Sequence, residues 1–363
     1  MAHYKISDVA EEVKDRENNP SESKYDRFVG LEHYLSGDVE ITHFGSTERL
    51  ESAMKVFKAG DILIARRNVY LKRASTVSFD GLTSGDSIVL RAKDPTIARI
   101  LPFVLNTDDF WDYADQYSDG TMSKRLSPKL LLAYEFDLPD DGLEDFADLL
   151  WAANETRNSY RELLRQTDEL VKSQFIEMFG SPESVMDSAH TIDEVADVQV
   201  GIVIKPTRFY ADGNNGIKAF RSLNIGPMCI KDDDWVYFTE DAMKETQRTI
   251  AHTDDILVVR SGNPGTSCVV PPEYDGCNVI DLIIAHPNKE KVLPAYLSAF
   301  TNMPHGMNQI NSQQRGVAQK HFNVGMYKDL KLILPSLDKQ KQFVDFLKQS
   351  DKSKHSNQFS NNT

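Results

Sequence analysis

The stretch LEDFADLLWAANETRNSYRELLRQTDELVKSQFIEM, residues 143–178, decides how the rest of the chain is organised. It contains no proline or glycine and is rich in residues that lose little free energy on entering a helix. Apolar residues recur at alternating spacings of three and four, which predicts one long helix with a coiled-coil-like apolar stripe. The stripe comprises Phe146, Leu150, Ala153, Tyr160, Leu164, Val171 and Met178, and polar residues interrupt it at Arg157, Thr167 and Gln174.

Both ends of this stretch carry signals that stop a helix. Pro139 and Gly142 precede it, and Gly180 and Pro182 follow it. At 1.5 Å per residue the helix would be a rod of roughly 50 Å, which is long for a helix inside one domain. The sequence therefore predicts a spacer with a domain on each side.

Length and composition are those of a globular protein with more than one domain. A chain of 363 residues, 40% of them hydrophobic, is long enough for two or three domains with real cores. The three cysteines, Cys229, Cys268 and Cys277, have no CxxC spacing, which favours a reducing compartment over a disulfide framework. No window reaches the run of about 18 apolar residues that a membrane span needs. We expect a cytoplasmic protein with no membrane segment.

The second half of the chain repeats the order of the first. Segment HTIDEVAD resembles YKISDVAEE at an offset of 186 residues, and DILVVR (255–260) matches DILIAR (61–66) at 194. KQFVDFL after Pro335 matches EDFADLL after Pro139 at 197. Offsets that rise steadily are expected from a duplication with small loop insertions. The sequence predicts a tandem repeat in which each unit is a strand-containing domain, a Leu-Pro pair and a helix.

Motifs of common enzyme classes are absent from the sequence. It has no GxxxxGK[ST], GxGxxG, GxSxG or HExxH. Asp61, Asp86, Asp255 and Asp281 occupy equivalent places in the two halves and could act as catalytic pairs, but capping of turns and strand entries is favoured. The run of three aspartates at 232–234 is read as a solvated turn. We therefore expect no metal and no cofactor, which a methyltransferase or nuclease would need.

The basic residues point to a different function. A net charge of −14 argues by itself against a nucleic-acid partner, because Lys and Arg carry phosphate binding. Basic side chains nevertheless cluster in each half, and the polar loop predicted at 307–321 also carries Gln and Asn, which can pair bidentately with adenine. An ordinary hydrophilic loop is the alternative interpretation. The candidate DNA-binding residues are Arg66, Arg67, Lys72, Arg73, Lys124, Arg125, Arg260, Gln313, Gln314, Arg315 and Lys320.

The duplicated plan carries a resemblance to a known family. The DILIAR and DILVVR strands, the KSQFIEMFG end of the first helix and the LPSLDKQKQFVDFL entry to the second resemble the DNA-specificity subunit of type I restriction-modification systems. The resemblance covers almost the whole chain. It implies two target-recognition domains, each reading one half of a split DNA site, and two long helices that set the gap and dock the methylating subunits. It also implies that the chain has no catalytic activity of its own.

This resemblance fixes the expected fold class and domain boundaries. We expect an α+β protein with two pseudo-repeated mixed α/β target-recognition domains, at 1–142 and 181–336, separated by long antiparallel coiled-coil-like helices. The central spacer helix would occupy 143–180, and a second, shortened one would occupy 337–363 with a polar tail. The apolar rhythm is lost after Leu347, and the tail SDKSKHSNQFSNNT reads as disordered. Either the sequence is truncated there, or another polypeptide completes the seam of the first helix.

The functional expectation is a non-catalytic reader of a bipartite DNA target. Its partners would be double-stranded DNA, modification (methyltransferase) subunits and restriction (endonuclease or translocase) subunits. The alternative is a protein-binding scaffold whose two domains sit on a helical spacer and have no role with DNA. The acidic balance of the chain favours the scaffold, whereas the basic clusters and the family resemblance favour the DNA reader.

Overall fold

The computed structural model describes the chain except for residues 121–122, 204–205, 214, 315–321 and 357–363. It has a mixed α/β fold that divides into two compact units, Met1–Tyr160 and Arg161–Thr363. In the part of the chain that the structure describes, no helix combines the length and the apolar character that crossing a membrane requires.

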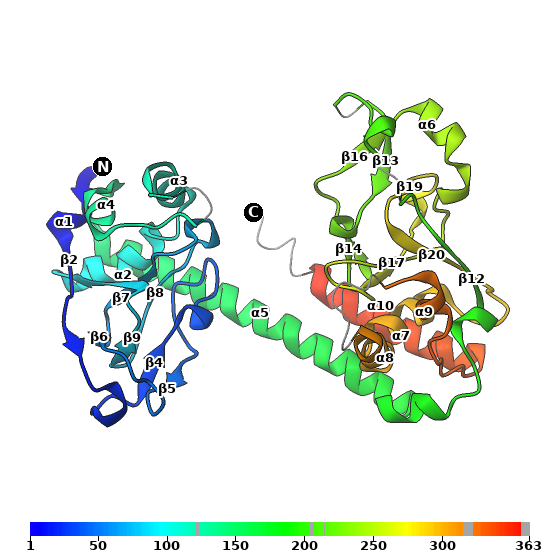
Figure 1. Cartoon of the computed structure of the whole chain (residues 1–363), viewed down its shortest axis with the longest axis horizontal. Coiled ribbons are helices and arrows are strands. Elements are labelled where there is room, and N and C mark those ends of the chain that lie inside the picture. Colours follow the sequence, from blue (N-terminus) through cyan, green and yellow to red (C-terminus); the bar gives the residue numbers. More distant parts are fainter. Residues whose placement is uncertain (121–122, 204–205, 214, 315–321, 357–363) are drawn as a thin grey trace. The chain divides into compact units, whose positions relative to one another are not determined.

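The first unit is built on a four-stranded antiparallel sheet whose strand β7 (Ile62–Ala65) is entirely buried. The sheet order is β2-β10-β7-β8, with β2 at Ala10–Glu12, β10 at Ser87–Ala92 and β8 at Ala74–Thr76. Three helices complete this core (Figure 1): α2 (Pro95–Val104), α3 (Asp108–Tyr117) and α4 (Pro128–Ala133). The aromatic rings of Phe110 and Trp111 in α3 fill its centre.

Further strands of the first unit form two other sheets. A five-stranded sheet has the order β3-β6-β9-β4-β5, and a two-stranded one pairs β1 with β11. Their bounds are β1 (Ala2–Lys5), β3 (Arg16–Glu17), β4 (Arg27–Val29), β5 (Gly45–Ser46), β6 (Met54–Phe57), β9 (Gly81–Thr83) and β11 (Glu135–Leu138).

The second unit contains a four-stranded antiparallel sheet of the order β12-β20-β17-β18. Its remaining strands form sheets β16-β13-β19 and β14-β15. The strands are β12 (Ala196–Val200), β13 (Ile217–Phe220), β14 (Ile225–Gly226), β15 (Cys229–Ile230), β16 (Val236–Phe238), β17 (Ile256–Val259), β18 (Ser267–Val269), β19 (Asn278–Val279) and β20 (Leu282–Pro287). The helices are α6 (Glu240–Glu245), α7 (Pro294–Asn302), α8 (Pro304–Gln314), α9 (Val324–Lys328) and α10 (Leu337–Ser356).

The two four-stranded sheets share buried polar contacts as well as strand order. In the first unit Asn106 donates from Nδ2 to the carbonyl oxygen of Ala74 at 2.6 Å. In the second, Asn302 donates from Nδ2 to the carbonyl oxygen of Ser267 at 2.8 Å. Asn106 lies just after α2 and Asn302 is the last residue of α7, and each ties its helix to the edge strand of its sheet, β8 or β18. The local architecture of the sheet and its first helix is therefore the same in both units.

Helix α5 (Leu143–Phe179) is a single helix of 37 residues whose two ends belong to different cores. Ala147 is buried in the first unit, whereas Val171 and Phe175 are buried in the second. At its C-terminus Gly180 adopts φ +91° and donates its N–H to the carbonyl oxygen of Ile176 at 2.8 Å. This left-handed ending favours glycine and explains where the helix stops.

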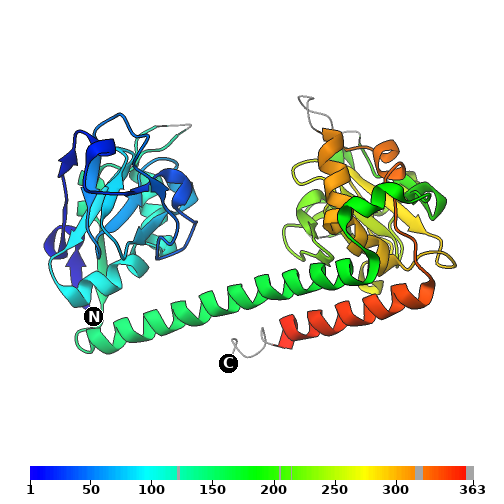
Figure 2. The same cartoon turned by 90° about the horizontal axis from the view of Figure 1, so that it is seen from below.

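Helix α10 packs within the second unit against the last turns of α5 (Figure 2). The rings of Phe343 and Phe175 meet edge to face with centroids 5.0 Å apart. At 20 residues α10 is shorter than α5. The interpretation of 350–363 as disordered is wrong for 350–356, which continue α10, and 357–363 lie outside the described residues.

Two local sequence predictions are also wrong. The segment HYKISDVAEEV, read as one short helix beginning at Ser7, is β1, the four-residue helix α1 (Ile6–Val9) and β2. Pairing of β2 with β10 takes precedence over helix propensity there. The loop predicted at 307–321 is helical as far as Gln314, because α8 buries Ile310 in the core of the second unit.

Candidate nucleic-acid interface

Three arginines of the first unit gather around Asp86, at the turn that leads into β10. Asp86 accepts a hydrogen bond from Arg125 Nη2 at 2.6 Å and forms an ion pair with Arg67, whose Nε lies 2.9 Å from Asp86 Oδ1. Arg66 lies beside them, and its backbone N–H donates to the Asp86 carbonyl oxygen at 2.9 Å. One carboxylate thus faces three guanidinium groups, which leaves the cluster positively charged.

The backbone explains why residues so distant in sequence meet there. Leu126 donates its N–H to the Arg66 carbonyl oxygen at 2.9 Å, and Arg66 returns a bond from Nε to the Leu126 carbonyl oxygen at 3.2 Å. The Asn68 N–H donates to the Lys124 carbonyl oxygen at 2.9 Å. Burial, and next the nearby charge of Arg125, lower the pKa of the Arg66 guanidinium, which stays protonated at any physiological pH.

The remaining basic candidates of the first unit already have partners. Lys72 Nζ lies 2.5 Å from Asp108 Oδ1. Lys124 Nζ lies 2.7 Å from Asp115 Oδ2. Arg73 donates to two backbone carbonyl oxygens, including that of Arg67 at 3.1 Å. The structure therefore brings Arg66, Arg67 and Arg125 into one cluster, while the two lysines pair with carboxylates of α3.

Arg260 of the second unit occupies the position of Arg66. Its Nε donates to the Phe322 carbonyl oxygen at 3.1 Å, and its Nη1 lies 2.6 Å from Asp281 Oδ1. The Phe322 N–H donates in turn to the Arg260 carbonyl oxygen at 3.2 Å. Because the side chain is only 14% exposed, most of its hydrogen-bonding capacity holds the end of β17 to the segment before α9. It therefore presents little charge to a ligand.

The glutamines of the second unit lie at the C-terminal end of α8. Within the described residues, Gln313 Oε1 and Gln314 Nε2 are buried and have no hydrogen-bond partner. A buried polar atom without a partner costs free energy until a ligand or water satisfies it. Arg315 and Lys320, the other two candidates from this segment, lie outside the described residues.

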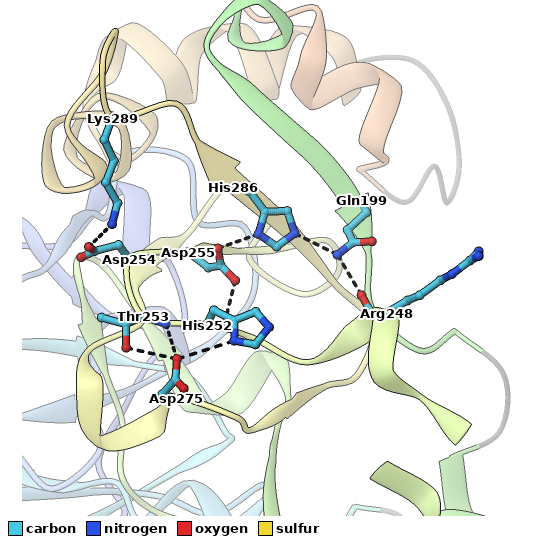
Figure 3. A network of polar contacts seen from close by, with 9 residues as sticks. All are labelled: Gln199, Arg248, His252, Thr253, Asp254, Asp255, Asp275, His286 and Lys289. Atoms are coloured by element: carbon cyan, nitrogen blue, oxygen red, sulfur yellow. Dashed lines mark hydrogen bonds and ion pairs between the residues drawn. The ribbon is translucent and has the colours of Figure 1, made fainter. Parts of the chain in front are cut away.

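A polar network in the second unit was not found from the sequence. His286 Nδ1 lies 2.6 Å from Asp255 Oδ1, and its Nε2 lies 2.9 Å from Gln199 Nε2 (Figure 3). Gln199 also donates to the Arg248 carbonyl oxygen at 2.8 Å. The hydrogen bond that His286 donates to Asp255 raises the pKa of the imidazole, and burial opposes this rise without cancelling it.

The first unit has an arginine in place of this histidine. Arg91 contacts Asp61 bidentately, with Nε and Nη2 at 2.7 and 2.6 Å from the two carboxylate oxygens. Asp61 and Asp255 also accept a backbone N–H from the preceding turn, as the capping interpretation of these aspartates expects. The basic partners of these aspartates, Arg91 and His286, stand 195 residues apart in sequence, as the strands β10 and β20 that carry them do. That offset is the sequence signal that could have identified the two side chains as equivalent.

The described residues offer little for covalent or metal chemistry. No group of three or more His, Cys, Asp or Glu among them could hold a metal ion. Burial raises the pKa of the Cys268 thiol to about 12, which suppresses the thiolate that a nucleophile requires. Charged and amide side chains for binding are what the arrangement provides.

Comparison with known proteins finds a family match in the second unit. The family model described as "Type I restriction modification DNA specificity domain" matches residues 191–361, all within the second unit. Residues 191–361 are therefore similar to a type I DNA specificity domain, which agrees with the resemblance seen in the sequence. The match covers fewer than half of the residues of this chain. No curated protein sequence matches the chain.

Solved structures support the fold of the chain beyond the matched domain. The S subunit of the type I restriction-modification system from M. genitalium aligns at a TM-score of 0.51 and 13% identity, covering 98% of this chain and 92% of the other. The HsdS subunit from Thermoanaerobacter tengcongensis aligns at a TM-score of 0.38 and 16% identity, covering 99% and 91%. The first likeness shows a shared mixed α/β fold.

Proposed function

We propose that this specificity chain reads a DNA target in two separate halves, one with each unit, within a type I restriction-modification complex. Residues 1–142 and 181–336 act as the two target-recognition domains, and 143–180 and 337–363 act as spacer helices. The chain holds modification and restriction subunits in the cytoplasm and performs no chemistry itself. The observation that carries the proposal is the pair of matching arginine sites at Arg66 and Arg260 in a chain with a specificity domain.

Equivalent contacts in both units support a duplicated reader. Each arginine donates from Nε to a carbonyl oxygen just before a short helix, Leu126 before α4 and Phe322 before α9. Each unit also ties a helix to its sheet through an asparagine. Two copies of one scaffold with different surface side chains would read two different half-sites. Lys and Arg then neutralise phosphates, and side chains at loop ends contact base edges.

The exposed face of α5 supports a docking role. Leu163 and Leu170 are 46% and 54% exposed and stand seven residues apart on one side of the helix. Large exposed apolar side chains in a row mark protein contact sites more often than solvent-facing surface. This surface, the leucine stripe, is the proposed contact of the modification subunits.

Selection from random duplex DNA tests the proposal. The chain is co-purified with its modification subunit, incubated with the DNA pool, and the retained DNA is sequenced. Two short motifs with a constant gap are expected. Insertion of seven residues in the middle of α5 adds about 10 Å of helix and should lengthen that gap without changing either motif. A single motif with no gap would refute the two-reader arrangement.

The alternative is a scaffold that binds proteins only, and the acidic balance of −14 favours it. Retention on duplex DNA at increasing salt separates the two functions, because phosphate neutralisation releases counterions and gives a steep salt dependence. An intact complex that shows no salt-dependent retention would favour the scaffold.

A further inference from the structure

A basic pocket opens beside the arginine cluster of the first unit. Its volume is about 320 Å³, and its lining consists of Glu12, Lys14, Arg16, Lys55, Arg66 and Gly85. Four cationic side chains thus face one carboxylate in a chain whose overall charge is strongly negative. This pocket, called the Lys55 pocket below, lies within the first unit between the end of β2 and strand β6.

Lys55 is the unusual member of this set, because it is only 9% exposed. Its Nζ donates to the Ser87 carbonyl oxygen at 2.9 Å and stands 3.8 Å from Glu12 Oε1, which is too far for a hydrogen bond. An ammonium group has three donors, so the described residues leave part of its capacity open. Arg16 and Lys14 at the rim are exposed.

The surroundings make this buried charge costly. Burial lowers the pKa of Lys55, the Glu12 carboxylate opposes that effect, and the charges of Arg66 and Arg16 add to it. A stable core would ordinarily avoid a buried cation beside further cations, since incompletely offset buried charge costs free energy. An anion in the pocket removes that cost. Unfavourable charge that a ligand relieves is typical of a binding site.

The second unit has a pocket of about 510 Å³ that Thr249 lines in part, and its chemistry is different. Thr249 stands where the first unit has Lys55, three residues before the N–H that caps Asp255. Its cations, such as Arg208 and Lys244, are exposed, and Arg208 lies 3.6 Å from Glu245. A buried cation therefore distinguishes the Lys55 pocket from this pocket of the second unit.

We propose that the Lys55 pocket binds a phosphate group, with Lys55 at its floor and Arg16 and Lys14 at its rim. In the assembled complex that group is a phosphodiester of the bound DNA, a step that rests on the proposed function. Glu12 limits the affinity, because its carboxylate repels the same anion. The contact fixes the position of the first unit on the duplex without reading a base.

The first arm of the test uses inorganic phosphate and the full-length chain with its modification subunit. Thermal unfolding is followed while phosphate replaces chloride at constant ionic strength. Phosphate should raise the unfolding temperature of the wild type, because binding to the native state stabilises it. Lys55→Gln and Arg16→Gln should each raise, by about tenfold, the phosphate concentration that gives the same rise in unfolding temperature. This is the loss expected for one charge-assisted hydrogen bond. Glu12→Gln should strengthen it, and Lys5→Gln, outside the pocket, is the matched control.

The second arm measures binding of the selected duplex DNA as a function of salt. Lys55→Gln should reduce the slope of log affinity against log salt by about 0.9, which corresponds to one phosphate contact. Arg16 is exposed, so Arg16→Gln keeps the test valid if Lys55→Gln impairs folding. The opposite signs expected for Glu12→Gln and Lys55→Gln separate phosphate binding from a structural role.

The outcomes distinguish this inference from the proposed function. If no variant alters either the phosphate effect or the salt slope, the pocket is not a phosphate site. A phosphate effect that depends on Lys55 together with an unchanged salt slope would mean that the pocket takes free phosphate and not DNA. Absence of any DNA binding by the wild-type complex would overturn the proposed function, while the inorganic phosphate arm would still decide the pocket.

Discussion

Exchanging His286 and Arg91 should transfer a pH dependence of stability from one unit to the other. Both side chains reach a buried carboxylate from equivalent strands, β20 and β10. Only the histidine titrates near neutral pH. The perturbations are therefore His286→Arg in the second unit and Arg91→His in the first, each made in the full-length chain.

The direction in which pH changes the stability of the second unit follows from the raised pKa of His286. Its usual value is 6.5, and the hydrogen bond donated to Asp255 raises it, opposed by burial and helped by the charges of Asp255 and Asp197. A group whose pKa is higher in the folded state adds stability that is complete below about pH 6.5 and is lost as pH rises through the folded pKa. The second unit should therefore be more stable at about pH 6 than at about pH 8.5.

The contacts of the His286 ring set the size of this change in stability. The Asp255 side chain is 7% exposed and its bond to His286 is 2.6 Å, so the charged pair is worth about 2 kcal/mol. The neutral ring still donates from Nδ1. Protonation turns Nε2 into a donor, so Gln199 must rotate its amide and give up its bond to the Arg248 carbonyl oxygen. The net difference between the two pH values should be about 1 kcal/mol.

Hydrogen exchange read by mass spectrometry can follow the two units separately. After correction for intrinsic exchange, peptides from β17 and β20 should open about fivefold more often at the higher pH, and His286→Arg should abolish this difference. Arg91→His should create a difference of the same sign in peptides from β7 and β10. An unchanged pH response of the second unit in His286→Arg would refute the assignment to this histidine.

Three further predictions concern packing. Asn302→Ala should destabilise the second unit by about 1–3 kcal/mol, because the carbonyl oxygens it serves are left without that donor; urea unfolding measures this, and a loss below the error would contradict it. Phe175→Ala should cost about 3–5 kcal/mol, since the ring is fully buried against Phe343, and a conservative Phe175→Leu should recover much of the lost unfolding temperature. Leu163→Glu should leave the unfolding temperature unchanged but reduce co-purification of the modification subunit, whereas equal recovery would remove the leucine stripe from the docking surface.

Local signals in the sequence were enough for the long helix and for the central strands. The helix expected at 143–178 is α5 at Leu143–Phe179, because an uninterrupted run of good helix formers ends at glycine on both sides. The strand expected at 61–65 is β7 for the same kind of reason. Each signal lies within the segment that it describes, and nothing elsewhere in the chain overrides it.

Contacts between segments that are distant in sequence could not be predicted from the sequence. Helix α8 reads as a polar loop because few of its side chains enter the core, with Ile310 the clearest apolar anchor. The partner of Asp255 is 31 residues away and reaches it through strand pairing, which residue composition does not encode. Of the candidate DNA-binding residues, spacing could indicate Arg66 and Arg260 as equivalents, but not that Arg260 would be mostly buried.

The middle of α5 can serve as a natural gauge of whether the chain is alone or assembled. From Arg161 to Leu170 no side chain is buried, so neither core covers these turns. Their persistence depends on helix propensity in the free chain, and amide exchange there should be far faster than at the ends held by Ala147 and Phe175. Any protein that covers this segment slows that exchange, so a single peptide can report occupancy without a label.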